Sequence, residues 1–255
     1  MFDYHIHTEF SFDSNEKMEK IALQSITNGM KEICFTDHLE YSVNSDWEDS
    51  LLPLLEYKKA IIDIANKYID KLTIKYGLEL GYYYQTIKEM NQYVKDVDVD
   101  FMLLSMHRIN NSGDVHIDME NYFKETLYII EHAKNYSVLA HLDFFKRYVD
   151  GLSDEIIFKK HYDIIETILK KLIDNGKGLE INTAGIRHGT HTTNPSINII
   201  KLYKELGGEI ITTGSDAHKI SDLSYKFEKT YNILKDLGFK YVCTFDKMVP
   251  TFNKI

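Results

Sequence analysis

The stretch FDYHIH, residues 2–7, sets two histidines two positions apart near the start of the chain. We interpret this stretch as a strand. Because the side chains of a strand alternate between its faces, His5 and His7 then point the same way. Two imidazoles on one face can bind a single metal ion. The same spacing is also typical of two polar residues near the end of an ordinary strand. Residues elsewhere in the chain are therefore needed to distinguish a metal site from an ordinary strand end.

Apolar strand-like runs alternate with helical patterns along the whole chain. Further strands are predicted over residues 32–36, 72–80, 101–106, 137–141, 178–182, 209–213 and 241–245. Helices are predicted over residues 15–30, 51–68, 85–95, 119–134, 153–174, 195–207 and 223–235. Asp13 or Ser14 is expected to cap the first helix, and Gly29 to end it. About seven β-α units without a linker predict one domain, residues 1–255, with a parallel sheet covered by helices.

Length and composition limit the classes of protein to which this chain can belong. The 255 residues are normal for an α/β barrel, and 44% of them are apolar, enough for a sizeable core. With 30 basic and 39 acidic residues, the net charge of −9 argues against nucleic-acid or membrane partners. Cys34 and Cys243 lie in apolar runs, as buried free thiols do. No signal-peptide or membrane-spanning pattern is present, so we expect a cytoplasmic protein. The oligomeric state is not predicted.

A residue able to bind a metal stands at or just after the carboxyl end of each of the first seven predicted strands. Besides the two histidines of the first strand, these residues are Asp37, His38, Glu79, His107, His141, Glu180, Asn182, Asp216 and His218. In α/β barrels these strand ends form the active-site face, which favours a closed barrel over an open doubly wound sheet. Without a metal, so many buried imidazoles and carboxylates would be left unpaired. The number and type of ligands predict two or three divalent ions, Mn²⁺, Fe²⁺ or Zn²⁺.

This pattern resembles the polymerase and histidinol phosphatase (PHP) superfamily, and within it the histidinol-phosphate phosphatases. The supporting stretches are HTEFSFDS from His7, HLDF from His141 with Arg147 and Tyr148, and GLEIN from Gly178 with Arg187. The resemblance implies a distorted, TIM-like (β/α)₇ barrel with a trinuclear metal site bridged by Glu79. The implied metal ligands are His5, His7, His38, Glu79, His107, His141, Asp216 and His218. Asp37 is interpreted as a hydrogen-bond partner of the ligands.

The resemblance also implies a reaction, the hydrolysis of L-histidinol phosphate in histidine biosynthesis by a metal-activated hydroxide. Glu79, Asp216 and His218 are the implied catalytic residues. Arginine suits phosphate geometry, and of the three arginines in the chain Arg147 and Arg187 are the expected phosphate ligands, by resemblance and by position. The remaining candidates for substrate binding are Glu9, Asp143, His188 and His191.

Three alternatives stay open. The first is another PHP phosphoesterase that acts on a nucleotide, a sugar phosphate or a phosphoprotein. The second is an amidohydrolase-type barrel, against which His107 counts because those barrels commonly place a lysine at the fourth strand end. The third is a metal-binding module without turnover, which a phosphatase assay of the metal-loaded protein would separate from the enzymes.

Overall fold

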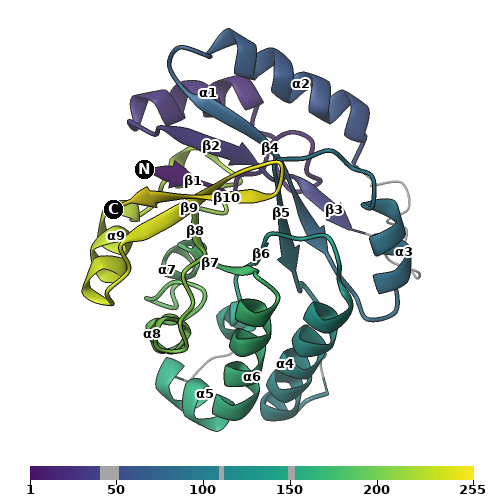
Figure 1. The fold of residues 1–255 in the computed structure, drawn as a ribbon, viewed down its shortest axis with the longest axis vertical. Helices are drawn as coiled ribbons and strands as arrows, with labels where there is room; N and C mark the ends of the chain where they lie inside the picture. Colours follow the sequence, from purple (N-terminus) through teal and green to yellow (C-terminus); the bar gives the residue numbers. More distant parts are fainter. Residues whose placement is uncertain (41–51, 109–111, 149–152) are drawn as a thin grey trace.

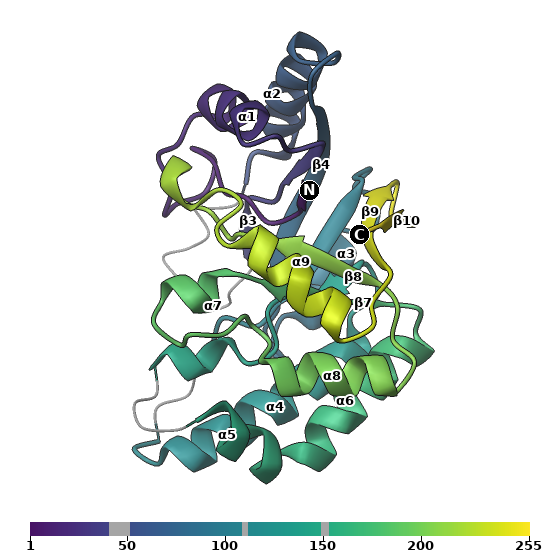
Figure 2. The ribbon, with the colours of Figure 1, turned by 90° about the vertical axis from the view of Figure 1, so that its left-hand side faces the viewer.

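The computed structural model describes residues 1–40, 52–108, 112–148 and 153–255. Parallel strands lie around a common centre, and helices surround them on the outside, from α1 and α2 past α3 and α4 to α9 (Figure 1). Turned by 90°, the same arrangement shows α1 and α2 at one end of the molecule and α4, α5 and α6 at the other (Figure 2). This is the layout of a sheet that is apolar on both faces and covered by helices.

Within the described residues the strands occupy seven positions in the barrel. In sheet order they are β1 (Phe2–Asp3), β2 (Glu32–Phe35), β4 (Thr73–Gly81), β5 (Phe101–Ser105), β6 (Val138–Leu139), β7 (Gly178–Asn182) and β8 (Ile211–Gly214). The short strand β3 (His38–Glu40) continues beyond β2 and pairs with β4, which sets His38 beside Glu79. The first and last positions meet where Tyr4 N donates to Thr213 O (2.9 Å) and His7 N to Ala217 O (3.0 Å). The predicted TIM-like barrel is confirmed.

The helices are amphipathic and turn their apolar side to the sheet or to a neighbour. They are α1 (Met18–Thr27), α2 (Leu54–Lys67), α3 (Ile87–Tyr93), α4 (Val115–His132), α5 (Asp154–Lys160), α6 (Tyr162–Asp174), α7 (Ala184–Arg187), α8 (Ile197–Glu205) and α9 (Phe227–Asp236). The described residues also form the 3₁₀ segments η2 (Phe144–Tyr148) and η3 (Ile220–Asp222). In α6 the buried residues Ile165, Ile168 and Leu172 recur at three- and four-residue steps, the spacing of one helix face. None of the helices in the described ranges has the length and apolar character that a membrane crossing needs.

Some predicted boundaries were wrong for reasons that lie in tertiary contacts. The first helix begins only at Met18, and Ser14 donates to His218 O (3.1 Å) instead of capping it. Its end was predicted well, because Gly29 takes the positive φ of 69° that helix ends favour. The helix expected over residues 153–174 is two helices, because His161 leaves the helical conformation (φ −111°, ψ 21°).

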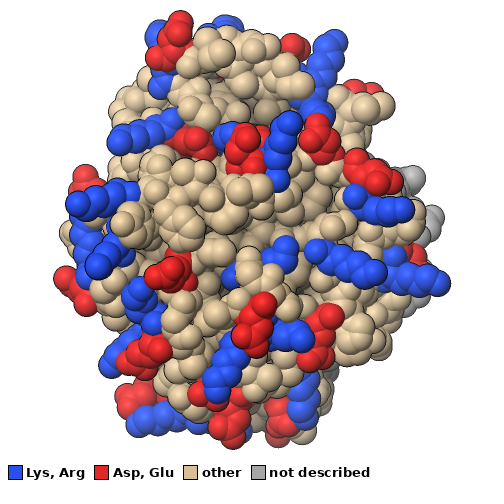
Figure 3. Space-filling view, viewed as in Figure 1, with Lys and Arg blue, Asp and Glu red and all other residues tan. Residues whose placement is uncertain are grey.

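A hairpin of β9 (Tyr241–Asp246) and β10 (Val249–Lys254) covers the amino-terminal end of the barrel. There the ring of Phe245 packs on Phe101, with centroids 5.0 Å apart, and on Tyr4 at 6.3 Å. The two cysteines are buried in the same apolar cluster, and both are free thiols as predicted. On this face basic and acidic side chains are interspersed (Figure 3). The opposite, carboxyl end of the barrel holds the site.

Candidate metal centre

A pocket of about 320 Å³ opens at the carboxyl ends of the strands. Most of the predicted ligands that line it come from different strands or the loops just after them, as parallel strands place them. The lining residues are Phe12, Asp13, His38, Glu40, Glu79, Tyr83, His107, His141, Phe144, Arg147, Tyr148, Asp216 and His218. His5 and His7 lie beneath this surface and are fully buried.

Glu79, near the end of β4, is the centre of the cluster. Its side chain is buried, and Ser105 on the neighbouring strand donates a hydrogen bond of 2.7 Å to its Oε1. Its two oxygens lie 3.0–3.3 Å from a ring nitrogen of each of His5, His7, His38, His107 and His141. One carboxylate that faces five imidazoles has the geometry of a bridging ligand.

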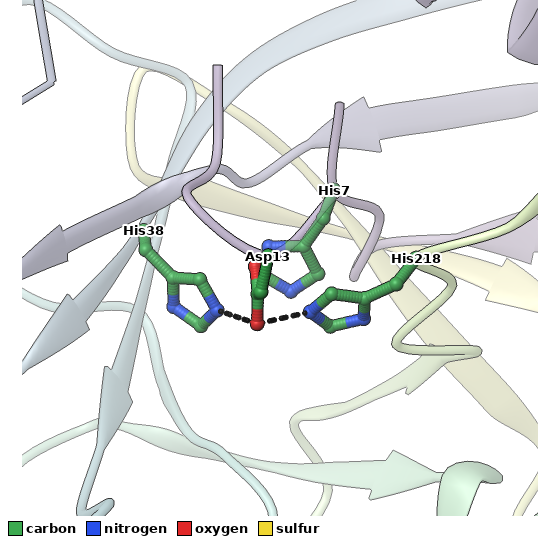
Figure 4. Close-up of side chains that lie close together, drawn as sticks. All are labelled: His7, Asp13, His38 and His218. Carbon is green, nitrogen blue, oxygen red and sulfur yellow. Dashed lines mark hydrogen bonds and ion pairs between the residues drawn. The ribbon is translucent and has the colours of Figure 1, made fainter. Parts of the chain in front are cut away.

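A second carboxylate and a third complete the cluster. Asp216 Oδ1 lies 3.3 Å from His7 Nε2 and 3.5 Å from His218 Nδ1. Asp13 Oδ2 lies between two rings, 3.0 Å from His218 Nε2 and 3.5 Å from His38 Nε2 (Figure 4). His7 lies behind Asp13 in the same view. The loop after the first strand thus adds a candidate ligand, Asp13, that the pattern of strand ends did not show.

The donor set fits divalent metal ions. The buried atoms His5 Nε2, His7 Nε2, His38 Nδ1 and Glu79 Oε2 have no hydrogen-bond partner, although buried polar atoms normally have one. Four overlapping groups bring their ligand atoms within 4.8 Å of one another, as ligands of one ion would be. The groups are His5, His7 and Asp216; His5, Glu79 and His141; His38, Glu79 and His107; and His7, Asp13, His38 and His218. Metal ions would satisfy atoms that the protein leaves without partners.

Burial and the mutual charges of these groups set their protonation. Burial, with the nearby His38 and His218, lowers the pKa of His7 to about 3, which keeps a ring nitrogen free to bind a metal. Burial also lowers the pKa of His107, but the charges of Glu79 and Glu40 outweigh it and raise that pKa to about 9. Burial alone would raise the pKa of Glu79, yet the surrounding imidazoles hold it well below its usual range. The carboxylate is therefore ionised and ready to bind a cation.

Further side chains orient the imidazoles from outside the cluster. Glu180 Oε1 lies 2.6 Å from His5 Nδ1, and Glu40 Oε1 lies 2.7 Å from His107 Nδ1. Each leaves the other ring nitrogen facing Glu79, the arrangement that fixes a histidine for metal binding.

The hydroxyl group of Ser11 orients the His7 ring in the same way. Ser11 Oγ lies 3.1 Å from His7 Nδ1 and donates to Asp37 (2.6 Å). Asp37 thus contacts Ser11, which in turn contacts His7, and does not face the centre of the cluster. Its place next to His38 in the sequence suggested this position outside the cluster.

Comparison with known proteins identifies the family. A model of the PHP domain matches residues 3–184, which include His5, His7, Glu79 and His141. The chain belongs to the PHP domain family. This PHP protein is 31% identical to the histidinol-phosphatase of Lactococcus lactis over 266 residues, 99% of this chain and 97% of that protein. It is also 31% identical to a probable histidinol-phosphatase of Thermotoga maritima, with 98% of each chain covered.

A solved structure is similar over the same length. It is the crystal structure of histidinol phosphate phosphatase from Lactococcus lactis, complexed with zinc, L-histidinol and phosphate. Its TM-score to this PHP protein is 0.85 at 28% identity, with 98% of both chains covered. The predicted membership of the PHP superfamily is confirmed.

The residues expected to bind phosphate lie in different surroundings. The Arg147 guanidinium lines the pocket and stacks 3.8 Å above the ring of Phe144, which in turn lies against His141. Arg187 instead donates to Ser215 O (3.0 Å) and Asp216 O (2.9 Å). These carbonyl groups engage two of the five N–H donors of the guanidinium, and Arg187 Nε lies 3.4 Å from Asp222 Oδ2.

The other predicted substrate residues are not brought into the pocket lining. Glu9 accepts from Met18 N (2.9 Å) and so holds the start of α1, the role expected of Asp13 or Ser14. Asp143 is buried and faces Lys146 at 3.1 Å. His188 and His191 are exposed in the loop after α7. Burial lowers the pKa of His188, and both nearby arginines add to this effect.

Several lining residues of the PHP pocket carried no recognised signal. Glu40 lies on the unpredicted strand β3, where Tyr83 donates to it (2.6 Å). Phe12 stacks on His38 with ring centroids 5.1 Å apart. The segment from Glu40 to Ser50, for which the sequence is consistent either with a cover over the site or with ordinary surface, lies outside the described residues except for Glu40.

Arg187→Met should impair Asp216 more than substrate affinity. Asp216 has a φ of 52°, which residues other than glycine rarely adopt, and Arg187 holds its carbonyl group in place. By analogy with other residues that orient metal ligands, we expect metal retention or kcat to fall about 10- to 100-fold, with a smaller change in KM. Metal analysis and steady-state kinetics measure both. A raised KM with unchanged kcat and metal content would instead support the phosphate-binding role.

Proposed function

We propose that this protein hydrolyses L-histidinol phosphate to L-histidinol and inorganic phosphate. The observation that carries the proposal is the convergence of five imidazoles on Glu79 beneath a pocket that also presents the cationic side chain of Arg147. Metal ligands next to a guanidinium suit a phosphomonoester. Full-length similarity to histidinol-phosphatases supports the choice of substrate.

The metal centre is proposed to hold two or three divalent ions, Mn²⁺, Fe²⁺ or Zn²⁺. Three ions would share the ligands as the overlapping groups suggest, with Glu79 as the bridge and Asp13 as an additional ligand beside His38 and His218. When bound, such ions lower the pKa of water and neutralise charge on phosphoryl oxygens. The imidazole and carboxylate donors favour these ions over Mg²⁺ and Ca²⁺, which prefer oxygen ligands alone.

The chain's own residues are proposed to bind and orient the substrate. Arg147 would bind the phosphoryl group in the pocket, where its stacking on Phe144 limits its movement. Asp216 and His218 follow β8 directly and hold the side of the cluster nearest Asp13. Together with Glu79 they form the proposed catalytic set, because their positions decide where the phosphorus atom lies.

The proposed setting is histidine biosynthesis in the cytoplasm. We propose that residues 1–255 act as one catalytic domain on a small-molecule phosphomonoester, without nucleic-acid or membrane partners. The net charge of −9 supports this choice, because it disfavours polyanionic surfaces. The alternative is a different phosphoester as substrate of the same PHP site.

Phosphate release from a panel of substrates tests the proposal. The purified protein is loaded with Mn²⁺, Fe²⁺ or Zn²⁺ and given L-histidinol phosphate, nucleotides, sugar phosphates and a phosphotyrosine peptide. We expect the highest kcat/KM with L-histidinol phosphate. A higher kcat/KM for another member of the panel would mean that the proposed substrate is wrong and that the catalytic site is right. No phosphate release with any metal would favour a binding module.

Arg147→Ala should weaken substrate binding without removing the metals. The guanidinium lies in the pocket lining but in none of the four groups of metal-ligand candidates. A lost charge-assisted contact of about 1.5–3 kcal/mol corresponds to a rise in KM of about 10- to 100-fold. Initial rates against substrate concentration, with metal analysis of the same sample, measure this. An unchanged KM would exclude Arg147 as a phosphate ligand.

A further inference from the structure

A buried lysine lies directly before the pocket arginine. The Lys146 side chain is only 3% exposed, although a charged ammonium group is costly to bury. It belongs to η2, the same 3₁₀ segment that carries Phe144 and Arg147 into the pocket. Such a group is retained in a protein interior when it is fully paired, and its pairing then fixes the geometry of what surrounds it.

The ammonium group of Lys146 is paired with three separate segments. Within η2's own loop it faces Asp143 at 3.1 Å. It donates to Thr192 Oγ1 (3.0 Å) and Thr193 O (2.8 Å) in the loop after α7, and it lies 3.4 Å from Asp154 in α5. One buried cation thus joins η2 to two elements that follow it in the chain.

The loop that Lys146 contacts is itself attached to the barrel. Asn194 N donates to Asn182 O (2.9 Å) at the end of β7, and Asn182 N donates back to Asn194 O (2.8 Å). Asn182 is buried and contacts Asp216 at 3.4 Å. The anchor point of Lys146 is therefore fixed to the same strand end that supports the metal ligands.

We propose that Lys146 is a positioning residue that sets the place of Arg147 in the pocket. The inference rests on the proposed phosphatase function. On the other side of η2, Phe145 inserts into the core against Tyr122 and Phe123. Phe145 fixes the depth of the segment, and the Lys146 contacts fix its rotation, so that Arg147 stays stacked on Phe144 and faces the metal ligands. Lys146 lines no part of the pocket and acts through Arg147.

A double-mutant cycle with Lys146→Met and Arg147→Ala tests this role. Methionine has an unbranched side chain similar in length to that of lysine, but it carries no charge. We expect Lys146→Met alone to raise KM about tenfold, with kcat changed less and the metal content unchanged, because it displaces a group that orients the substrate. In the Arg147→Ala background the same substitution should leave KM unchanged. Multiplicative effects on KM, or a lower melting temperature with an unchanged KM, would overturn the proposal.

A matched control and a milder variant keep the proposal testable even if the Lys146→Met protein does not fold. Lys159→Met removes an exposed lysine of α5 that pairs with Glu155 (2.6 Å), and it should change neither KM nor kcat. If Lys146→Met does not fold, Thr192→Val removes one acceptor of the ammonium group, and a smaller rise in KM is expected. An unchanged KM for a folded Thr192→Val protein would then contradict the proposal.

The choice of ligand separates this inference from the proposed function. The cycle is measured with L-histidinol phosphate, with 4-nitrophenyl phosphate, and as inorganic phosphate binding to the metal-loaded protein by calorimetry. If only 4-nitrophenyl phosphate is hydrolysed, the natural substrate is wrong, but the cycle still decides the role of Lys146. If nothing is hydrolysed, weaker phosphate binding in Lys146→Met that disappears in the Arg147→Ala background supports the inference, and equal binding overturns it.

Discussion

Glu79→Gln is expected to abolish phosphate release and to reduce the metal content of the purified protein. Glutamine keeps the size of the side chain and a hydrogen bond to Ser105, but it removes the charge that faces five imidazoles. Loss of the proposed bridge would remove several kcal/mol of charge stabilisation, and about 4 kcal/mol corresponds to a thousandfold fall in kcat. Steady-state phosphate release and elemental analysis of the same preparation measure both effects.

The control for this substitution is Glu155→Gln in α5. Glu155 is exposed and pairs only with Lys159 among the contacts that the structure gives its side chain (2.6 Å). Exposed pairs of this kind contribute about 0–1 kcal/mol, so activity and metal content should remain those of the unmodified protein. A Glu79→Gln protein that kept its metals and its kcat would show that Glu79 is not the bridge. A thermal melt establishes that the variant is folded.

The strand-end histidines and acids could be predicted because two local rules agree. Apolar runs marked the strands, and in a parallel barrel the carboxyl ends of all strands meet on one face. His107 and His141 lie 28 and 62 residues from Glu79, yet both contact it, because β5 and β6 follow β4 in the sheet. Correct strands in the correct order are enough to assemble such a cluster from the sequence.

Asp13 and Glu40 could not be predicted because they do not follow a long strand. Asp13 lies in a loop whose course depends on packing, and its carboxylate resembles a helix cap in sequence. Glu40 belongs to a strand of three residues that exists only through its pairing with β4. Gly81 leaves the room for the Glu40 side chain, since a Cβ atom there would come within 2.6 Å of it. Such contacts between distant segments have no local pattern.

Two of the residues expected to bind substrate show that a side chain's neighbourhood in the sequence does not fix its contacts. Arg187 and Asp143 both follow strand-end residues, and from sequence either could face the pocket. The structure directs Arg187 to backbone carbonyls and Asp143 to a buried lysine. Distance along the chain limits where a side chain lies, but the partners that satisfy its donors or acceptors decide where it points.

Removal of the metals is expected to abolish activity and to lower the melting temperature of a protein that remains folded. The apolar core of the barrel is formed by other side chains than the candidate ligands, and its closing hydrogen bonds join backbone atoms, whereas the cluster leaves buried ring nitrogens without partners. Ions present at about a thousand times their Kd would stabilise the fold by about 4 kcal/mol per site, and a chelator removes this contribution. Phosphate release and differential scanning calorimetry, before and after chelation, measure the two losses.

Adding single metal ions back to the chelated protein then distinguishes a catalytic metal centre from a structural one, because activity and melting temperature are measured separately. Mn²⁺, Fe²⁺ or Zn²⁺ should recover both activity and melting temperature, while Mg²⁺ and Ca²⁺ should recover neither, because imidazole nitrogens dominate the ligand groups. Recovery of the melting temperature alone would mean that the ions bind without forming the catalytic arrangement. Full activity of the chelated protein, with metals absent by elemental analysis, would contradict a metal-dependent reaction, because Glu79 and its five imidazoles would then have to act without a cation.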